Sequence, residues 1–165
     1  MQPNGMPSNQ PHPDCLGCAI ALGRLLPPGG RLGESEHFVV HQDPEVPVRG
    51  FLIIASKRHL RSIAEMSAAE AAELFALVHR ARLAQAQAAR ITEVRLVQEE
   101  RSGHFHLWLL PWEPWMEARF ANSLTSLREI MRVAKEERST EDGMREVLQA
   151  AAAIQACLSI PPAVE

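Results

Sequence analysis

This chain of 165 residues has no long apolar run, no excess of positive charge and only three cysteines. No apolar run approaches the roughly 20 residues of a membrane-spanning helix, and the N-terminus lacks the basic-then-apolar order of a signal peptide. The formal net charge of −3 argues against general nucleic-acid binding, which requires a basic surface. Three cysteines suit a reduced compartment better than a secreted disulfide framework. We therefore expect a cytoplasmic protein with no membrane partner.

The remaining composition is that of a globular domain, with 46% hydrophobic and 22% charged residues. Residues 1–13 are rich in Pro, Asn, Gln and Ser, and we expect a disordered tail there. A capping-box signature at Ser67 begins a helix that runs to about Ala89. Strands are predicted near residues 31–32, 38–41, 51–55, 93–99 and 104–110. Strands on both sides of one long central helix predict an α+β fold with an antiparallel sheet.

Histidine or tryptophan alternates with apolar residues in the segment GHFHLWLLP, residues 103–111. Side chains of a strand point alternately to opposite faces, so His104, His106 and Trp108 share one face. The residues between them are apolar and predict a core-facing side. Two neighbouring imidazoles are either satisfied histidines on a sheet surface or parts of a ligand, metal or catalytic site.

A Cys-x-x-Cys pair stands near the start of the chain, at Cys15 and Cys18. Such a pair is typical of a redox site or of half a tetrahedral zinc site. A redox pair would lie between a strand and a helix, whereas this pair follows a proline-rich tail, which favours zinc. Zinc needs two further nitrogen or sulfur ligands, and His59 and His104 are the candidates. Two unligated thiols in a reduced compartment are the other interpretation.

Taken together, these segments resemble the histidine triad (HIT) family, whose members act on nucleotide phosphates. The family motif is His-φ-His-φ-His-φ-φ, where φ is apolar, and residues 104–110 read His-Phe-His-Leu-Trp-Leu-Leu. The Cys-x-x-Cys pair, the segment 37–44 and the segment 49–59, which ends in Lys-Arg-His, precede it in the family's order. The resemblance covers residues 14–111, which we interpret as a HIT-like domain.

The resemblance implies a function for individual residues of this chain. Its positions for structural zinc fall on Cys15, Cys18, His59 and His104. His106 matches the nucleophile, and Asp43 matches the acid that binds ribose hydroxyls. The implied enzyme is a hydrolase or nucleotidyl transferase that forms a nucleotidyl-histidine intermediate. Its ligand would be a nucleotide or dinucleotide, as a phosphoanhydride, a phosphoramidate or a dinucleoside polyphosphate. Because family members often dimerise, a homodimer is expected.

The sequence departs from the family pattern in two places. Trp108 replaces the third histidine, and indole cannot shuttle a proton, although it can stack on a base or sugar. The loop before the motif is short, and its glutamates at 99 and 100 would repel a phosphate. Gln98, Ser102 and Gly103 are the candidate phosphate ligands in that loop. These departures leave two alternatives: a catalytically impaired nucleotide-binding module, or a zinc-stabilised scaffold or dimerisation protein.

The last third of the chain, residues 112–165, has no counterpart in this resemblance. Apolar residues recur at helical spacing around 120–134 and again around 144–154. The pattern predicts two C-terminal helices that form an extension packed on the same domain.

Overall fold

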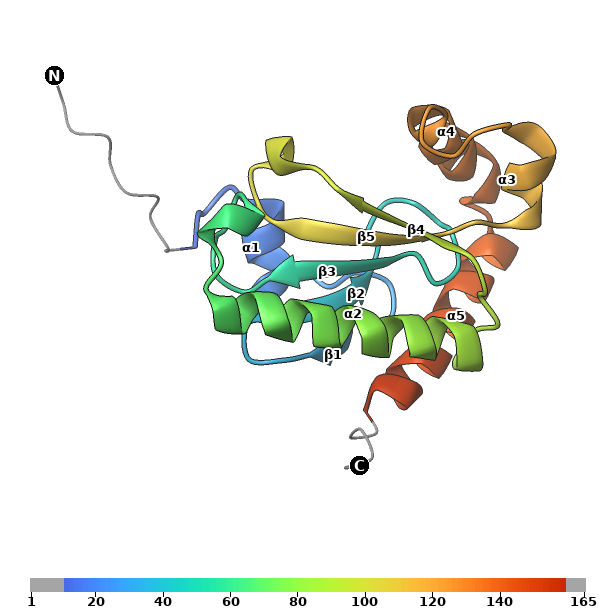
Figure 1. Ribbon diagram of the computed structural model, residues 1–165. Helices are drawn as coiled ribbons and strands as arrows, with labels where there is room; N and C mark the ends of the chain where they lie inside the picture. The colour runs from blue at the N-terminus through green and yellow to red at the C-terminus, as the bar shows by residue number, and fades with distance from the viewer. Residues whose placement is uncertain (1–10, 160–165) are drawn as a thin grey trace, which may run out of the picture.

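A computed structural model describes residues 11–159, which form a five-stranded antiparallel sheet with helices on both faces (Figure 1). The order across the sheet is β1-β2-β3-β5-β4, so the predicted α+β fold with an antiparallel sheet is confirmed. The strands are β1 (Arg31–Glu34), β2 (Phe38–Gln42), β3 (Leu52–Ser56), β4 (Val94–Gln98) and β5 (His106–Pro111). The helices are α1 (Leu16–Ala21), α2 (Ala68–Ala88), α3 (Pro114–Arg119), α4 (Leu127–Arg138) and α5 (Glu141–Leu158). Two 3-10 turns, η1 (Ile63–Glu65) and η2 (Glu100–Ser102), complete the elements.

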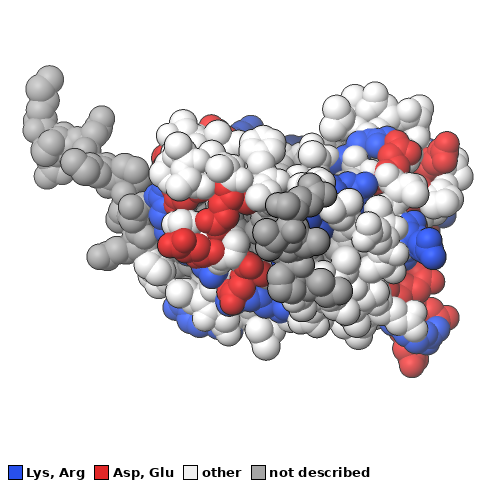
Figure 2. Space-filling model, turned by 60° about the horizontal axis from the view of Figure 1, so that its bottom comes forward, with Lys and Arg blue, Asp and Glu red and all other residues white. Residues whose placement is uncertain are grey.

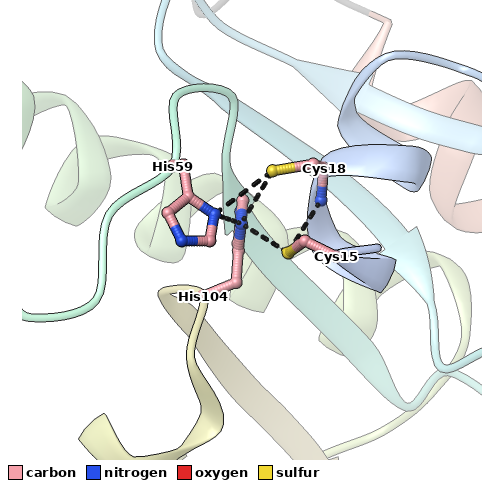
Figure 3. A group of neighbouring side chains, drawn as sticks. All are labelled: Cys15, Cys18, His59 and His104. Atoms are coloured by element: carbon pink, nitrogen blue, oxygen red, sulfur yellow. Dashed lines mark hydrogen bonds between the residues drawn. The ribbon is translucent and has the colours of Figure 1, made fainter. Parts of the chain in front are cut away.

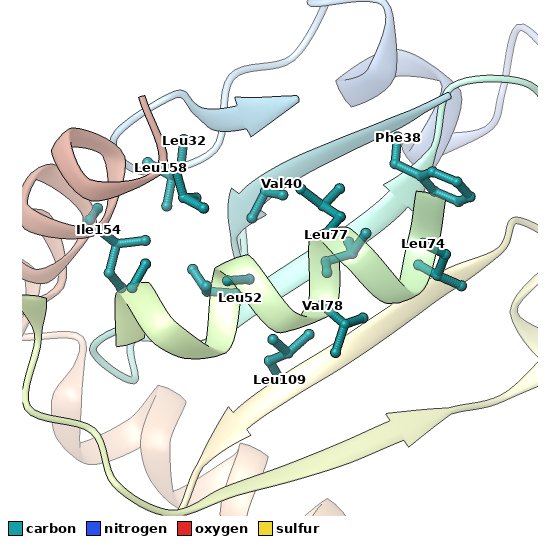
Figure 4. Packing of buried hydrophobic residues seen from close by; sticks show 14 of the residues in the cluster. Leu32, Phe38, Val40, Leu52, Leu74, Leu77, Val78, Leu109, Ile154 and Leu158 are labelled. Atoms are coloured by element: carbon teal, nitrogen blue, oxygen red, sulfur yellow. The ribbon is translucent and has the colours of Figure 1, made fainter. Parts of the chain in front are cut away.

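One face of the sheet is covered by the long helix α2 (Figure 4). The predicted capping box begins this helix: the Ser67 hydroxyl accepts from the Glu70 amide, and the Glu70 carboxylate accepts from the Ser67 amide. Leu74, Leu77 and Val78 then point at the sheet from successive turns. They pack on Leu52 and Leu109, which lie on neighbouring strands. Burial of this apolar stripe holds the helix on the sheet.

Helix α5 belongs to the same core. Its Ala151, Ile154 and Leu158 are buried with Leu32 of β1, and the helix also contacts α2 (Figure 4). The C-terminal helices predicted from the apolar spacing are present, with bounds 127–138 and 141–158. The extension therefore completes the core beside β1.

The opposite face of the sheet is covered only in part. Val39, Ile53 and Ala55 point to this side and join a second apolar cluster with Met116 of α3 and Ile130 of α4. Helix α1 lies over another part of the same face, against β3. Within residues 11–159, no helix covers the sheet between α1 and α4, and this part of the sheet forms the floor of the candidate site described below.

Residues 11–159 include no helix that is both long and apolar enough to cross a membrane. On the face in Figure 2, lysine and arginine side chains are interspersed with acidic ones, without a broad basic surface. The predicted N-terminal tail falls mainly outside the described residues. Residues 11–13 are exposed, and the His12 amide donates to the Cys18 sulfur at 3.4 Å.

Candidate metal centre and adjoining pocket

The two cysteines and two histidines predicted to bind zinc meet in one place (Figure 3). Cys15 is the N-cap of α1 and Cys18 lies in its first turn, so both sulfurs point to the same side of the helix. His59 follows β3, and His104 precedes β5. One ligand atom from each of the four residues lies within 4.8 Å of all the others.

The distances between these atoms fit the edges of a zinc tetrahedron. Zn–N bonds of about 2.05 Å and Zn–S bonds of about 2.3 Å give tetrahedral edges of about 3.3 Å for N···N and about 3.5 Å for N···S. The two Nδ1 atoms of His59 and His104 are 3.3 Å apart. The sulfur of Cys18 lies 3.3 Å from His59 Nδ1 and 3.5 Å from His104 Nδ1. The Cys15 sulfur lies 3.4 Å from His104 Nδ1.

Groups around the centre orient its ligands. His104 Nε2 lies 2.9 Å from the carbonyl oxygen of Ser56, so Nε2 carries the hydrogen and Nδ1 has the free lone pair. Burial lowers the pKa of His104, which keeps the ring in the neutral form that binds metals. Burial raises the pKa of the Cys18 thiol, so a cation at the centre is needed to hold it as a thiolate. The donor set and its surroundings fit zinc, and the predicted structural zinc site is confirmed.

The loop that carries His59 is fixed by its neighbours. The guanidinium of Arg58 donates to the Glu70 carboxylate at 2.5 and 2.8 Å, which ties the loop to the start of α2. The Lys57 ammonium donates to the carbonyl of Ser35 at 2.6 Å. His59 is therefore held between an ion pair and a backbone contact, which suits a preorganised ligand.

A cavity of about 770 Å³ opens beside the metal centre, over the uncovered part of the sheet. This volume is within the range that small-molecule sites occupy. Ile53, Ala55, His106 and Trp108 lie on its floor, because paired residues of β3 and β5 share a face. Leu16, Gly17 and Ile20 of α1 form one wall, and Met131 and Lys135 of α4 form another.

Most of the predicted ligand-binding residues line this cavity. Asp43, Ser102, Gly103, His106 and Trp108 all do. Trp108 stands next to His106, with ring centroids 6.0 Å apart, and it forms a T-shaped pair with Phe51.

Gln98 does not line the cavity. Its register partner on β5 is Leu107, whose side chain packs on the α2 side, so Gln98 points away from His106. The candidate phosphate ligand Gln98 is therefore on the wrong face of the sheet. Glu99 and Glu100 do not line the cavity either. The Glu100 carboxylate instead accepts a hydrogen bond from the Ser62 hydroxyl at 2.6 Å. The expected repulsion of a phosphate by that loop is thus weaker than its sequence indicates.

Asp43 is shaped to offer one free oxygen. Its Oδ1 accepts from the amides of Glu45 and Val46 at 2.9 and 2.7 Å, as in an Asx turn, and no described residue bonds Oδ2. Burial raises the pKa of Asp43 above its ordinary value, and the two amide donors oppose that rise. An accessible Oδ2 beside a cavity suits a ligand hydroxyl.

Sequence reasoning missed several residues of the cavity. His41 is only 3% exposed and lines the cavity. Arg61 and Lys135 line the cavity, while Arg101 of the loop does not. His41 and Val39 share a face by strand alternation, which was a usable signal. Lys135 could not be found that way, because helical spacing does not show where α4 docks.

The fold is similar to that of solved histidine triad structures. A Zn-bound histidine triad family protein from Mycobacterium smegmatis matches with a TM-score of 0.58 at 19% identity, over 87% of this chain and 96% of that chain. A hypothetical histidine triad nucleotide-binding protein from Sulfolobus tokodaii matches with a TM-score of 0.60 at 23% identity, over 87% and 91%. A Hit-like protein involved in cell-cycle regulation from Bartonella henselae gives 0.55 at 13% identity, over 86% and 99%.

No protein-family model matches the sequence, and no curated protein matches it. The structural similarity nevertheless spans most of this chain and nearly the full length of these three structures. The chain therefore has the histidine triad fold, as the order of its motifs predicted. A Cys2His2 cluster with the geometry of a zinc site accompanies that fold.

Proposed function

We propose that this protein binds a nucleotide and acts as a hydrolase or nucleotidyl transferase, with His106 as the nucleophile. The observation that carries the proposal is the tautomer of His106. Its Nδ1 lies 3.0 Å from the carbonyl oxygen of His104, which can only accept, so the hydrogen is on Nδ1. The lone pair is then on Nε2, at the floor of the cavity. A positioned imidazole lone pair is what attack on phosphorus requires.

The proposed reaction has two displacements at the α-phosphorus. His106 Nε2 forms a bond to phosphorus while the P–O or P–N bond to the leaving group breaks. The leaving group departs with the electron pair and takes a proton from water. A water molecule or another acceptor then attacks phosphorus and gives its proton to solvent, the N–P bond breaks with its electron pair going to nitrogen, and the neutral imidazole returns. With water, the product is a nucleoside monophosphate.

Other residues of the cavity take the remaining parts of the ligand. Asp43 Oδ2 is free to accept from a ribose hydroxyl. We assign the phosphate oxygens to the backbone amide of Gly103 and to Ser102, both of which line the same cavity as His106. The Ser102 hydroxyl donates to the carbonyl oxygen of His104 at 2.9 Å and would turn from it to a phosphate oxygen. The Trp108 ring offers a surface for stacking. The Sulfolobus tokodaii protein of similar fold is itself described as nucleotide-binding.

Zinc, when bound to its four ligands, has a closed coordination shell and supplies stability rather than catalysis. The residues that hold it come from α1, the loop after β3 and the start of β5. Their convergence fixes α1 as the wall of the cavity. We therefore assign the metal a structural role beside the nucleophile.

The test compares wild-type protein with His106→Asn on diadenosine polyphosphates and nucleoside phosphoramidates. We expect turnover by the wild type and background rates from the variant, together with a labelled, acid-labile protein adduct in the wild type alone. Asn keeps a polar side chain of modest size, and matched melting temperatures show that the fold is intact. Equal, background turnover by both proteins would remove the enzymatic assignment.

A second candidate function is supported by Trp108. Indole stands in the position of the third histidine and has no lone pair to accept or relay a proton. A nucleotide-binding module without chemistry would then show calorimetric binding of a nucleoside monophosphate and no product from any substrate. The absence of binding heat across a panel of nucleotides would count against this candidate as well.

We also propose that the protein is a homodimer of the cytoplasm. The edge strand β4 supports the oligomeric state, because its hydrogen-bonding edge faces outward and Leu96 is 55% exposed. Light scattering on a sizing column measures the mass directly. A mass of one chain at micromolar concentration would contradict the dimer.

A further inference from the structure

A buried histidine that the proposed reaction does not use lies on the floor of the cavity. His41 of β2 is opposite Ile53 of β3, and Ile53 is opposite Trp108 of β5. Directly paired residues share a face, so His41, Ile53 and Trp108 form a row across the open side of the sheet. The adjacent row contains Ala55 and His106. His41 is thus on the same floor as the nucleophile.

The ring of His41 has one engaged nitrogen and one free nitrogen. Its Nδ1 lies 2.8 Å from the carbonyl oxygen of Gln42, so Nδ1 carries the hydrogen and Nε2 has the lone pair. Over residues 11–159, Nε2 has no hydrogen-bond partner, yet it is not among the fully enclosed unpartnered atoms. It is therefore open to added groups although the residue is only 3% exposed. A buried acceptor without a partner is costly unless a ligand completes it.

The ring stays an acceptor at physiological pH. Burial lowers the pKa of His41 to about 4, so the imidazole is neutral near pH 7 and Nε2 cannot donate. The residues that line the cavity with His41 suit a flat, apolar ligand that has a polar edge. Ile20 and Val46 are apolar, and Asp43, two residues after His41, is the proposed ribose ligand. In a nucleotide, the base is what is joined to that ribose.

We propose that His41 selects the nucleobase by accepting a hydrogen bond at Nε2 from an exocyclic amine. This inference rests on the proposed nucleotide binding and adds the chemical class of the base: adenine, guanine or cytosine rather than a base without an amine at that edge. His41 is then a specificity-determining residue, distinct from the nucleophile. It does not take the place of the missing third histidine, since a ring that resists protonation is a poor proton donor.

The experiment measures binding of matched nucleotides by calorimetry, with the full chain and its zinc. The pairs are adenosine and purine-riboside monophosphate, guanosine and inosine monophosphate, and cytidine and uridine monophosphate. These are products of the proposed reaction, so turnover does not interfere. In the wild type, loss of the amine should weaken binding about tenfold to a hundredfold in the pair that fits, as an unpaired buried acceptor requires.

Two variants of His41 separate recognition from packing. His41→Phe keeps a buried ring but has no acceptor, so it should abolish the difference within the pair. His41→Gln keeps an acceptor oxygen and should retain part of the difference. Equal affinities within all three pairs, or a difference that survives in His41→Phe, would overturn this inference alone. Absence of binding by every nucleotide would overturn the proposed function, and this inference with it.

Discussion

Gly17 lies so close to His104 that a β-carbon on the glycine would stand 2.5 Å from Cδ2 and Cγ of the imidazole. Real β-carbons do not approach ring atoms to that distance. Only a residue without a side chain therefore lets α1 bring Cys15 and Cys18 up to the histidine. The second of the two residues between the cysteines, Gly17, must therefore be a glycine.

We accordingly expect Gly17→Ala to push the His104 ring out of its ligand position. The cost should be about 1–3 kcal/mol, the usual penalty of an added methyl group in a filled site, together with lower zinc content. Metal analysis and thermal unfolding of the purified variant measure both effects. Leu22→Ala is the control, since Leu22 caps the same helix and is 51% exposed. Full zinc content and an unchanged melting temperature in Gly17→Ala would contradict the packing.

Removal of a thiol ligand should have a larger effect. Wild-type protein should contain about one zinc per chain, by the count of four ligands. Cys18→Ser should lose the metal and unfold at lower temperature, because ligation energy is folding energy at such a site. Cys157→Ser is the matched control: Cys157 is half-buried in α5, far along the chain from the cluster. Metal-free wild-type protein, with Cys18→Ser melting like it, would rule out the zinc site.

The sequence was most informative where spacing alone determines geometry. Strand alternation placed His106 and Trp108 on one face, and the Ser67 capping box marked the start of α2. The register of β4 against β5, which pairs Gln98 with Leu107 and turns Gln98 to the core side, was not predicted. Register is a tertiary property set by neighbouring strands, so a short sequence segment does not contain it.

Residues supplied by distant elements were also beyond sequence reasoning. Lys135 reaches the cavity because α4 docks over the second face, where the ammonium pairs with Glu45 at 2.5 Å. The short helix α1 was missed because its six residues have too few turns to show a periodicity. The zinc ligands were found for a different reason: chemistry limits which residue types can bind the metal.

The ion pair between Arg58 and Glu70 predicts a dependence of stability on pH. Hydrogen bonds from Arg58 lower the pKa of Glu70 to about 2, well below the ordinary value of 4.5. Between about pH 2 and pH 4.5, the Glu70 carboxylate is therefore charged in the folded state but protonated in the unfolded chain. The contribution to the free energy of unfolding is full above about pH 4.5, and it is lost as the pH falls towards 2. The size is about 3 kcal/mol, with burial of the Glu70 side chain limiting solvent screening.

Glu70→Gln tests this linkage. The variant should be less stable near pH 7, because it removes the charge of Glu70 from the ion pair with Arg58 and weakens the cap of α2. The difference in the free energy of unfolding between the variant and the wild type should become smaller as the pH is lowered from 5 to 2.5. Urea unfolding at a series of pH values measures this difference. Glu129→Gln is the control, since Glu129 forms an exposed pair with Arg132. The same difference in the free energy of unfolding at every pH would contradict this dependence on the Glu70 charge.

The packing of α5 predicts that residues 14–111 need this helix in order to fold. Its Ile154 is fully buried in the main cluster, whereas Leu148 on the same helix is 47% exposed. Ile154→Ala should therefore cost about 2–5 kcal/mol, and Leu148→Ala should be close to neutral. A chain cut after Pro111 lacks the whole helix and should show no cooperative thermal transition, with apolar surface open to a fluorescent dye. If that fragment instead melts cooperatively at the wild-type temperature, residues 14–111 fold alone and the C-terminal helices are free for an assembly role.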